Sequence, residues 1–181
     1  MKLEEVHSAC PNGLLTNSKV VFNVLDPNPN DLRLEDIAHA LSNLCRYGGH
    51  CPQFYSVAQH AVLCSHFPGT VNQKLKFLHH DDSEAFLVDM PRPIKKNLSQ
   101  YIDIEERLQA IIFPWLGLEY PFTDDIHHVD EAMLRIEYKA FFWEESDYTH
   151  EKELKSEFEF WSPQEAKIKY LNRHQELISM L

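Results

Sequence analysis

The chain has 181 residues, of which 44% are hydrophobic and 25% are charged, and its formal net charge at pH 7 is −11. This length and composition indicate one globular domain over residues 1–181 and exclude disordered and fibrous classes. The acidic balance argues against a nucleic-acid binder, which needs a broad basic face, but local cations and a metal ion could still hold a small phosphorylated ligand.

Targeting and redox signals point to the cytoplasm. No apolar run approaches the roughly 18 residues that a membrane helix requires, so no membrane partner is expected. The acidic N-terminus (MKLEEVHSAC) is unlike a signal peptide. The cysteines form no C-x-x-C pair, and a chain of this length builds a core without disulfides, so reduced thiols are expected at Cys10, Cys45, Cys51 and Cys64.

The N-terminal third begins with extended structure. Two apolar runs flank a Thr-Asn-Ser tripeptide in 13–25, which predicts a short hairpin. The prolines in 26–31 predict a turn, because each disfavours helix in the residue before it. Residues 32–45 then predict a helix, since one face collects Ile37, Ala38, Leu41, Leu44 and Cys45.

The middle of the chain alternates a loop with two helices. Two glycines and a proline in 46–55 (RYGGHCPQFY) predict a loop. Ser56 is a suitable N-cap for the helix that follows it. The next helix is expected to run without interruption through 71–88 and to stop at the prolines that follow, Pro91 and Pro93.

Three further helices are expected, over 98–118, 124–145 and 162–181, from apolar repeats at helical spacing. The last opens with the capping box Ser162-Pro163-Gln164-Glu165. It is expected to turn four side chains inward: Ile168, Leu171, Leu177 and Ile178. Together these elements predict an all-α bundle of about six helices. Its domain core is expected over about 31–145, and helix 162–181 is expected to pack against that core.

Titratable residues fall on the apolar faces of three of these helices. His60 lies on the buried stripe of its helix. His80 and Glu84 are four residues apart and would share one face of a continuous helix. Asp130 and Glu137 lie on the apolar side of the helix that carries them.

Two readings of these residues compete. A single histidine on an apolar face is more often a hydrogen-bonded core residue than a ligand. A carboxylate buried alone costs several kcal/mol or simply protonates, so several buried together predict a shared cation. The combination of His60, His80-Asp81 and Asp130 favours a metal site, because four such residues do not readily coincide by accident.

The order His … His-Asp … Asp, matched by His60, His80-Asp81 and Asp130, resembles the ligand pattern of the HD-domain metal-dependent phosphohydrolases. A glutamate four residues after the paired histidine and an aspartate nine residues after it make the chain similar to the 5′-deoxynucleotidase branch, and Glu84 and Asp89 match them. A proline-rich turn ending in lysine (MPRPIK, 90–95) and an arginine–aromatic pair, Arg46-Tyr47, match that branch too.

Residues 35–60 (EDIAHALSNLCRYGGHCPQFYSVAQH) further resemble phage-encoded members, among them dATP triphosphohydrolases. The resemblance extends from about residue 20 to 145. It implies an HD-domain helical bundle with one divalent transition metal, held by His60, His80, Asp81 and Asp130. Zn, Mn, Co and Fe all suit a mixed nitrogen and oxygen ligand set.

The resemblance also implies roles for the surrounding residues. Glu84 would orient or deprotonate the attacking water, and Asp89 would protonate the leaving sugar oxygen or anchor the sugar hydroxyl. Three residues would bind substrate: Arg46, Tyr47 and Lys95. Glu137 would orient a metal ligand or Arg46.

The implied activity is hydrolysis of deoxynucleotides at the α-phosphate. A monophosphate would give deoxynucleoside and phosphate, and a triphosphate, with dATP the favoured base, would give tripolyphosphate. The alternative is a non-catalytic nucleotide-binding HD module, whose expected signature is loss of a ligand or of Glu84. A (p)ppGpp or cyclic-nucleotide hydrolase is disfavoured, since those branches carry insertions that this chain lacks. The resemblance also implies a homo-oligomer, with the C-terminal helix available for contact.

Some residues depart from the pattern or imitate it. Tyr47 stands where the deoxynucleotidases carry tryptophan. His79 duplicates the ligand histidine, but only His80 gives both the His-Asp step and the glutamate four residues later. His127 and His128 point about 100° apart on a helix and are expected near the surface. A zinc knuckle at Cys45, His50 and Cys51 is discounted because no second pair exists at a suitable spacing.

Overall fold

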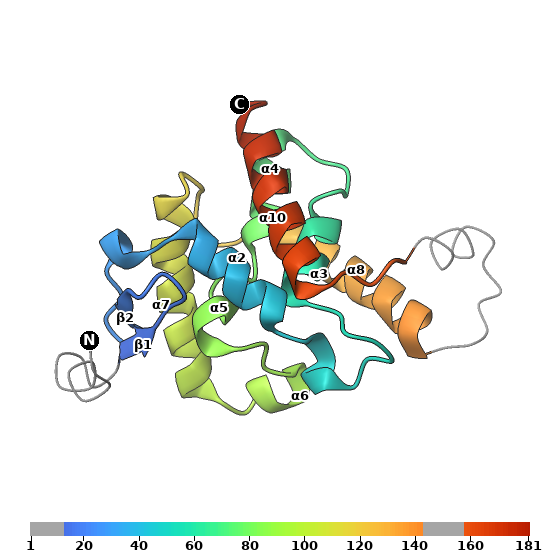
Figure 1. Cartoon of the computed structure of the whole chain (residues 1–181), viewed down its shortest axis with the longest axis horizontal. Coiled ribbons are helices and arrows are strands. Elements are labelled where there is room, and N and C mark those ends of the chain that lie inside the picture. The colour runs from blue at the N-terminus through green and yellow to red at the C-terminus, as the bar shows by residue number, and fades with distance from the viewer. Residues whose placement is uncertain (1–12, 143–157) are drawn as a thin grey trace.

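The computed structural model describes residues 13–142 and 158–181. Within these ranges the chain is a helical bundle with one two-stranded antiparallel hairpin near its N-terminus (Figure 1). The all-α class with a short hairpin, expected from the sequence, is confirmed. Six helices in these ranges have eight residues or more, which agrees with the expected number. Cys10 and the expected helix end at 143–145 lie outside the described residues.

The hairpin consists of β1 (Gly13–Leu15) and β2 (Val21–Asn23), with Leu14 opposite Phe22. The ring of Phe22 is fully buried and stacks on Phe86 at 4.1 Å between ring centroids. The loop of the hairpin is held from the first turn of the following helix. There Asp36 accepts hydrogen bonds from the Ser18 backbone N–H (2.8 Å) and the Ser18 hydroxyl (2.6 Å).

After a 3₁₀ turn, η1 (Pro29–Asp31), come α2 (Leu34–Asn43) and the short η2 (Arg46–Gly49). In η2 the backbone of Tyr47 and Gly48 has positive φ, of 57° and 60°, so the expected loop is a tight left-handed bend. Helix α3 (Val57–Cys64) begins where expected, because the Ser56 hydroxyl accepts the Gln59 N–H at 3.1 Å.

The expected continuous helix over 71–88 is wrong. The chain forms α4 (Val71–His79) and α5 (Glu84–Leu87), with a tight turn at 80–83 between them. His80 and Ser83 keep right-handed helical angles, but the backbone bonds of the turn span three residues, as in Asp82 N–H to His79 O (3.2 Å) and Glu84 N–H to Asp81 O (2.9 Å). The helix is therefore overwound here rather than broken open.

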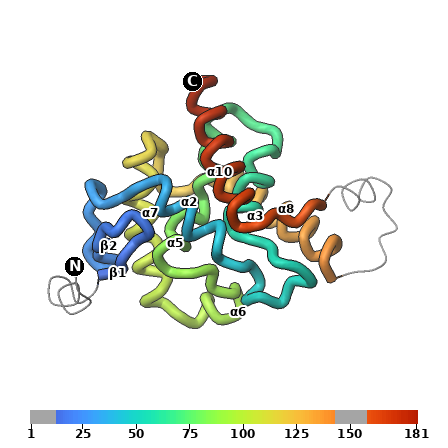
Figure 2. The backbone as a smooth tube through the Cα atoms, viewed as in Figure 1, coloured from blue at the N-terminus to red at the C-terminus, as the bar shows by residue number. Residues whose placement is uncertain are grey.

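The second half adds α6 (Arg92–Lys95), α7 (Ser99–Trp115), α8 (Asp124–Phe142) and α10 (Pro163–Ile178). The capping box at Ser162 is present in full. Helix α10 lies across α2, α3 and α4 (Figure 2). Its inward face differs from the expected one: Ile168 and Ile178 are 47% and 36% exposed.

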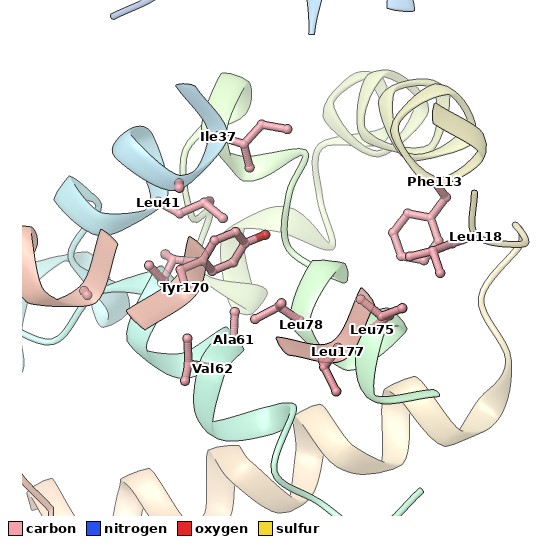
Figure 3. Packing of buried hydrophobic residues seen from close by; sticks show 14 residues of the cluster. Ile37, Leu41, Ala61, Val62, Leu75, Leu78, Phe113, Leu118, Tyr170 and Leu177 are labelled. Atoms are coloured by element: carbon pink, nitrogen blue, oxygen red, sulfur yellow. The ribbon is translucent and has the colours of Figure 1, made fainter. Parts of the chain in front are cut away.

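The face of α10 that is buried contains Ala166, Tyr170, Arg173 and Leu177. These residues recur at three- and four-residue steps, which is the spacing of one helix face, and Leu171 beside them is only partly buried. Tyr170 and Leu177 join the main core with Leu41 of α2, Ala61 of α3 and Leu78 of α4 (Figure 3). The C-terminal helix is therefore part of the central core.

Two further observations concern thiols and membranes. Three cysteines fall in the described ranges, Cys45, Cys51 and Cys64, and each is a free thiol. No helix in the described part of the chain is both long enough and apolar enough to cross a membrane.

The Asp36 contacts generate a pH-dependent prediction. Burial opposes ionisation, but the hydrogen bonds from Ser18 and Thr16 outweigh it and lower the pKa of Asp36. A carboxyl with a lowered folded-state pKa stabilises the fold above its unfolded pKa, and this contribution is lost as the pH falls through the folded value. Asp36→Asn should lower the free energy of unfolding by about 1–3 kcal/mol at pH 7. Urea unfolding at pH 7 and pH 3 should show that the unaltered chain and Asp36→Asn differ less in free energy of unfolding at pH 3. An equal difference at both pH values would contradict this account.

Candidate metal centre

Two histidines from different helices point the same nitrogen at one place. His60 of α3 approaches Glu137 Oε1 through Nδ1 at 2.5 Å, and His80, at the end of α4, approaches the carbonyl oxygen of Phe77 through Nδ1 at 2.8 Å. An ionised carboxylate and a carbonyl only accept hydrogen bonds, so both Nδ1 atoms are donors. The two Nε2 atoms lie 3.3 Å apart. Two nitrogen lone pairs that face each other at that distance repel, so a proton or a metal ion between them would be stabilising.

Two aspartates bring oxygens to the same point. Asp130 Oδ1 lies 3.3 Å from His60 Nε2 and 4.0 Å from His80 Nε2. Asp81 Oδ2 lies 3.6 Å and 3.3 Å from these atoms. Ligands about 2.0–2.1 Å from a tetrahedral ion stand about 3.3–3.4 Å apart. Four of the five separations are 3.3–3.6 Å, close to this spacing, and the fifth, from His80 to Asp130, is longer at 4.0 Å.

The electrostatics of the cluster also favour a cation. Burial disfavours the charged form of His60, and Arg46 repels it, but Cys64, Glu137 and Asp130 hold the pKa of His60 well above its usual value. Burial likewise opposes ionisation of Asp130, yet the hydrogen bond and charge of His60 lower the pKa of Asp130 far below its usual range. The surroundings thus favour positive charge at His60 Nε2, which either a proton or a metal ion supplies.

A thiol also lies beside the two histidines. Buried His60, Cys64 and His80 form a group that could hold a metal ion. Cys64 Sγ is 3.5 Å from His60 Nε2 and 4.0 Å from His60 Nδ1. A sulfur at nearly equal distances from the two ring nitrogens lies beside the ring rather than beyond Nε2. Cys64 would therefore have to turn to become a ligand, whereas the two aspartate oxygens already lie close to both Nε2 atoms.

Glu137 of α8 is fully buried and organises the surroundings of His60. Besides His60, it accepts hydrogen bonds from the hydroxyls of Tyr55 (2.7 Å) and Tyr47 and from Arg46 Nη2 (3.3 Å). Burial would raise its pKa, but Arg46 and His60 lower the pKa of Glu137 to about 2. An ionised Glu137 fixes the His60 tautomer and thereby keeps Nε2 free to bind a cation.

The tight turn at 80–83 changes how Glu84 relates to the other residues. At three residues per turn, side chains three apart share a face. Glu84 is therefore aligned with Asp81 and not, as the continuous helix implied, with His80. Asp81 and Glu84 line one cavity of about 220 Å³, together with Asp89 and Asp130.

Glu84 and Asp89 are the two carboxyls of this cavity that are not among the four expected ligands. Glu84 is buried, and its Oε2 has no hydrogen-bond partner. Burial, with the charges of Asp81 and Asp89, raises the pKa of Glu84 well above its usual value. Burial also raises the pKa of Asp89. A raised pKa brings a carboxyl closer to the range in which it exchanges protons with water or substrate.

Cations line the same cavity, and each contacts a carboxylate. Arg46 lies 3.5 Å from Asp81, and its Nε has no partner. Lys95 approaches both oxygens of Glu105, at 2.7 and 2.6 Å. Arg92 contacts Asp130 at 2.6 Å. Three cations beside a small cavity can neutralise a phosphate.

Tyr47 lies at the edge of the cavity, with its hydroxyl bound to Glu137. Its ring makes edge contacts with Tyr138 and Phe142. Only the ring of Tyr47 is therefore free to face a ligand. A second cavity, of about 350 Å³, also reaches Asp81 and Asp130 and extends past Lys95 to Glu105 and Tyr120.

Some contacts were not expected from the sequence. Tyr55 as a partner of Glu137 and Glu105 as a partner of Lys95 carry no motif, and only their burial marks them. His127 and His128 are exposed, as expected. His79 points elsewhere: its Nδ1 approaches Asp82 and its Nε2 approaches His174.

Comparisons with known proteins found two similar sequences, both of uncharacterized proteins. The chain is 43% identical over 112 residues to uncharacterized protein YfdR of Escherichia coli, covering 61% of each chain. It is 34% identical over 129 residues to an uncharacterized protein of Rhodobacter capsulatus, covering 64% of this chain and 66% of that protein. The chain thus spans less than two thirds of the length of each relative. No family model matches it.

Proposed function

We propose that the chain hydrolyses deoxynucleotides at the α-phosphate with one bound divalent transition metal, Zn, Mn, Co or Fe. A monophosphate would give deoxynucleoside and phosphate, and a triphosphate, dATP the favoured one, would give deoxynucleoside and tripolyphosphate. One observation carries the proposal: the Nε2 atoms of His60 and His80 converge with carboxylates of Asp81 and Asp130, and these two aspartates line a cavity together with Glu84 and three cations. The resemblance to HD-domain phosphohydrolases supplies the substrate class.

His60, His80, Asp81 and Asp130 would hold the ion, which when bound would supply Lewis-acid polarisation of a phosphate oxygen. Glu84 lines the cavity and its buried Oε2 has no hydrogen-bond partner; in its ionised form it would orient the attacking water and take its proton. Asp89, whose pKa is raised by burial, would deliver a proton to the leaving 5′-oxygen.

The cations would hold the phosphate. Arg46 has an unpartnered Nε and lines the cavity, so it can bind a phosphate oxygen while its other nitrogens stay with Glu137 and Asp81. Lys95 and Arg92 lie on the same wall. The ring of Tyr47 would pack against the sugar or the base. A homo-oligomer stays a prediction, which the native mass of the purified chain would check.

A product assay tests the proposal directly. Protein stripped of metal and reloaded with Mn²⁺, Co²⁺ or Zn²⁺ would be incubated with each dNMP and each dNTP, and the products separated by chromatography. We expect phosphate from monophosphates or tripolyphosphate from a triphosphate. Asp81→Ala should abolish turnover and bound metal together, whereas Asp103→Ala, an exposed aspartate of α7, should change neither. An absence of turnover with every ion would contradict the hydrolase proposal. Nucleotide binding without turnover would favour a non-catalytic binding module.

Glu84→Gln separates chemistry from metal binding. The amide keeps the size of the side chain but cannot take a proton from water, so kcat should fall by about 10²–10⁴-fold. Glu84 is not among the expected ligands, so the metal content should stay at the level of the unaltered chain. Glu119→Gln, at a position whose side chain is 88% exposed, is the matched control. Full activity in Glu84→Gln would contradict the assigned role.

A further inference from the structure

We infer that the C-terminal helix α10 helps to build the metal centre, because Tyr170 holds the tight turn that presents His80 and Asp81. The inference rests on the proposed metal centre. It concerns a positioning residue: Tyr170 would act through Asp82 and His79, the two residues that flank the His80-Asp81 pair in the sequence.

The tight turn divides its residues among separate faces. Side chains three apart are aligned when a helix is wound at three residues per turn. His79 and Asp82 therefore share a face, and Asp81 and Glu84 share another, which lines the 220 Å³ cavity. The His79–Asp82 face is turned toward α10, where both side chains are at most 1% exposed. Whatever fixes the His79–Asp82 face thus also sets the direction of the ligands.

Contacts with α10 fix that face. His79 Nδ1 lies 2.8 Å from Asp82 Oδ2, and Asp82 Oδ1 accepts the hydroxyl proton of Tyr170. The Tyr170 oxygen also lies 2.9 Å from His79 Nδ1. His174, one turn further along α10, lies 2.9 Å from His79 Nε2 through its Nδ1. Both oxygens of Asp82 and both ring nitrogens of His79 therefore have partners on the side away from the cavity.

The contacts with α10 also support the overwound turn and thereby the position of Asp81. Three-residue backbone bonds have poorer geometry than those of an α-helix, so an overwound turn needs support from its surroundings. A buried carboxylate that loses a donor must move toward another partner, because an unsatisfied charge in the interior is costly. Asp82 adjoins Asp81 directly, so its movement would shift the aspartate oxygen that faces His60 and His80. The pairing of His79 with Asp82 also accounts for the doubled histidine.

The test measures metal affinity on the full chain. Mn²⁺ and Co²⁺ would be titrated by calorimetry, and the visible spectrum of bound Co²⁺ would be recorded, for the unaltered chain and for Tyr170→Phe. We expect Tyr170→Phe to bind both ions about 10–100-fold more weakly and to change the Co²⁺ spectrum. His174→Ala, at the half-buried end of the network, should change affinity in the same direction and keeps the test usable if Tyr170→Phe folds poorly.

Leu177→Ala is the matched control, because it removes a fully buried apolar side chain of the same helix that takes no part in the hydrogen bonds of the turn network. It should lower the free energy of unfolding measured in urea, while the folded protein keeps its metal affinity and Co²⁺ spectrum. Unchanged affinity in Tyr170→Phe and His174→Ala, or an equal loss in Leu177→Ala, would overturn the inference and leave the metal centre standing. An unaltered chain that bound no ion would overturn the proposed function, and the inference with it.

Discussion

Glu137 carries a carboxylate with no exposure to solvent, and the geometry of the candidate site depends on how that charge is satisfied. An isolated buried carboxylate would cost several kcal/mol or would protonate. Four donors prevent this: His60 from α3, Arg46 and Tyr47 from η2, and Tyr55 from the segment before α3. Each donor thereby acquires a fixed orientation. The tautomer of His60, the position of the Arg46 guanidinium at the cavity and the loss of the Tyr47 hydroxyl as a ligand for substrate all follow from one charge on α8.

The overwound turn between α4 and α5 imposes a second constraint. Residues 79–84 have to bury some polar side chains and present others to a cavity. Winding at three residues per turn does both, because His79 and Asp82 can face α10 while Asp81 and Glu84 face the cavity. A regular α-helix would align Glu84 with His80 and so move it away from Asp81. The proximity of Asp81 is one reason, after burial, that the pKa of Glu84 is raised, so the winding of the backbone also contributes to the acid–base properties of the site.

Apolar periodicity and capping residues were enough to predict most helices. Local rules predicted the hairpin and the two helix N-caps, Ser56 and Ser162. An ordered sequence pattern predicted four residues that lie together in the structure: His60, His80, Asp81 and Asp130. The turn at 80–83 was not predicted, because the partners that hold it, such as Tyr170, lie in a distant part of the sequence that a local pattern does not weigh. The predicted inward face of α10 was right for Leu177 and wrong for Ile168 and Ile178. Tyr170 and Arg173 are buried through polar partners, which a hydrophobic pattern does not weigh, and this leaves the two isoleucines outside.

A chain with a net charge of −11 can hold an anion only if its local cations outweigh their own partners. In this structure Arg92 contacts Asp130, Arg46 contacts Asp81, and Lys95 contacts Glu105. Two of these three carboxylates, Asp81 and Asp130, belong to the proposed ligand set. Under the proposed function, a cation at the centre would share the charge of the same carboxylates that otherwise neutralise the two arginines. Phosphate affinity and metal affinity would then be coupled through Asp81 and Asp130, and each would strengthen the other by the same factor, as linkage requires.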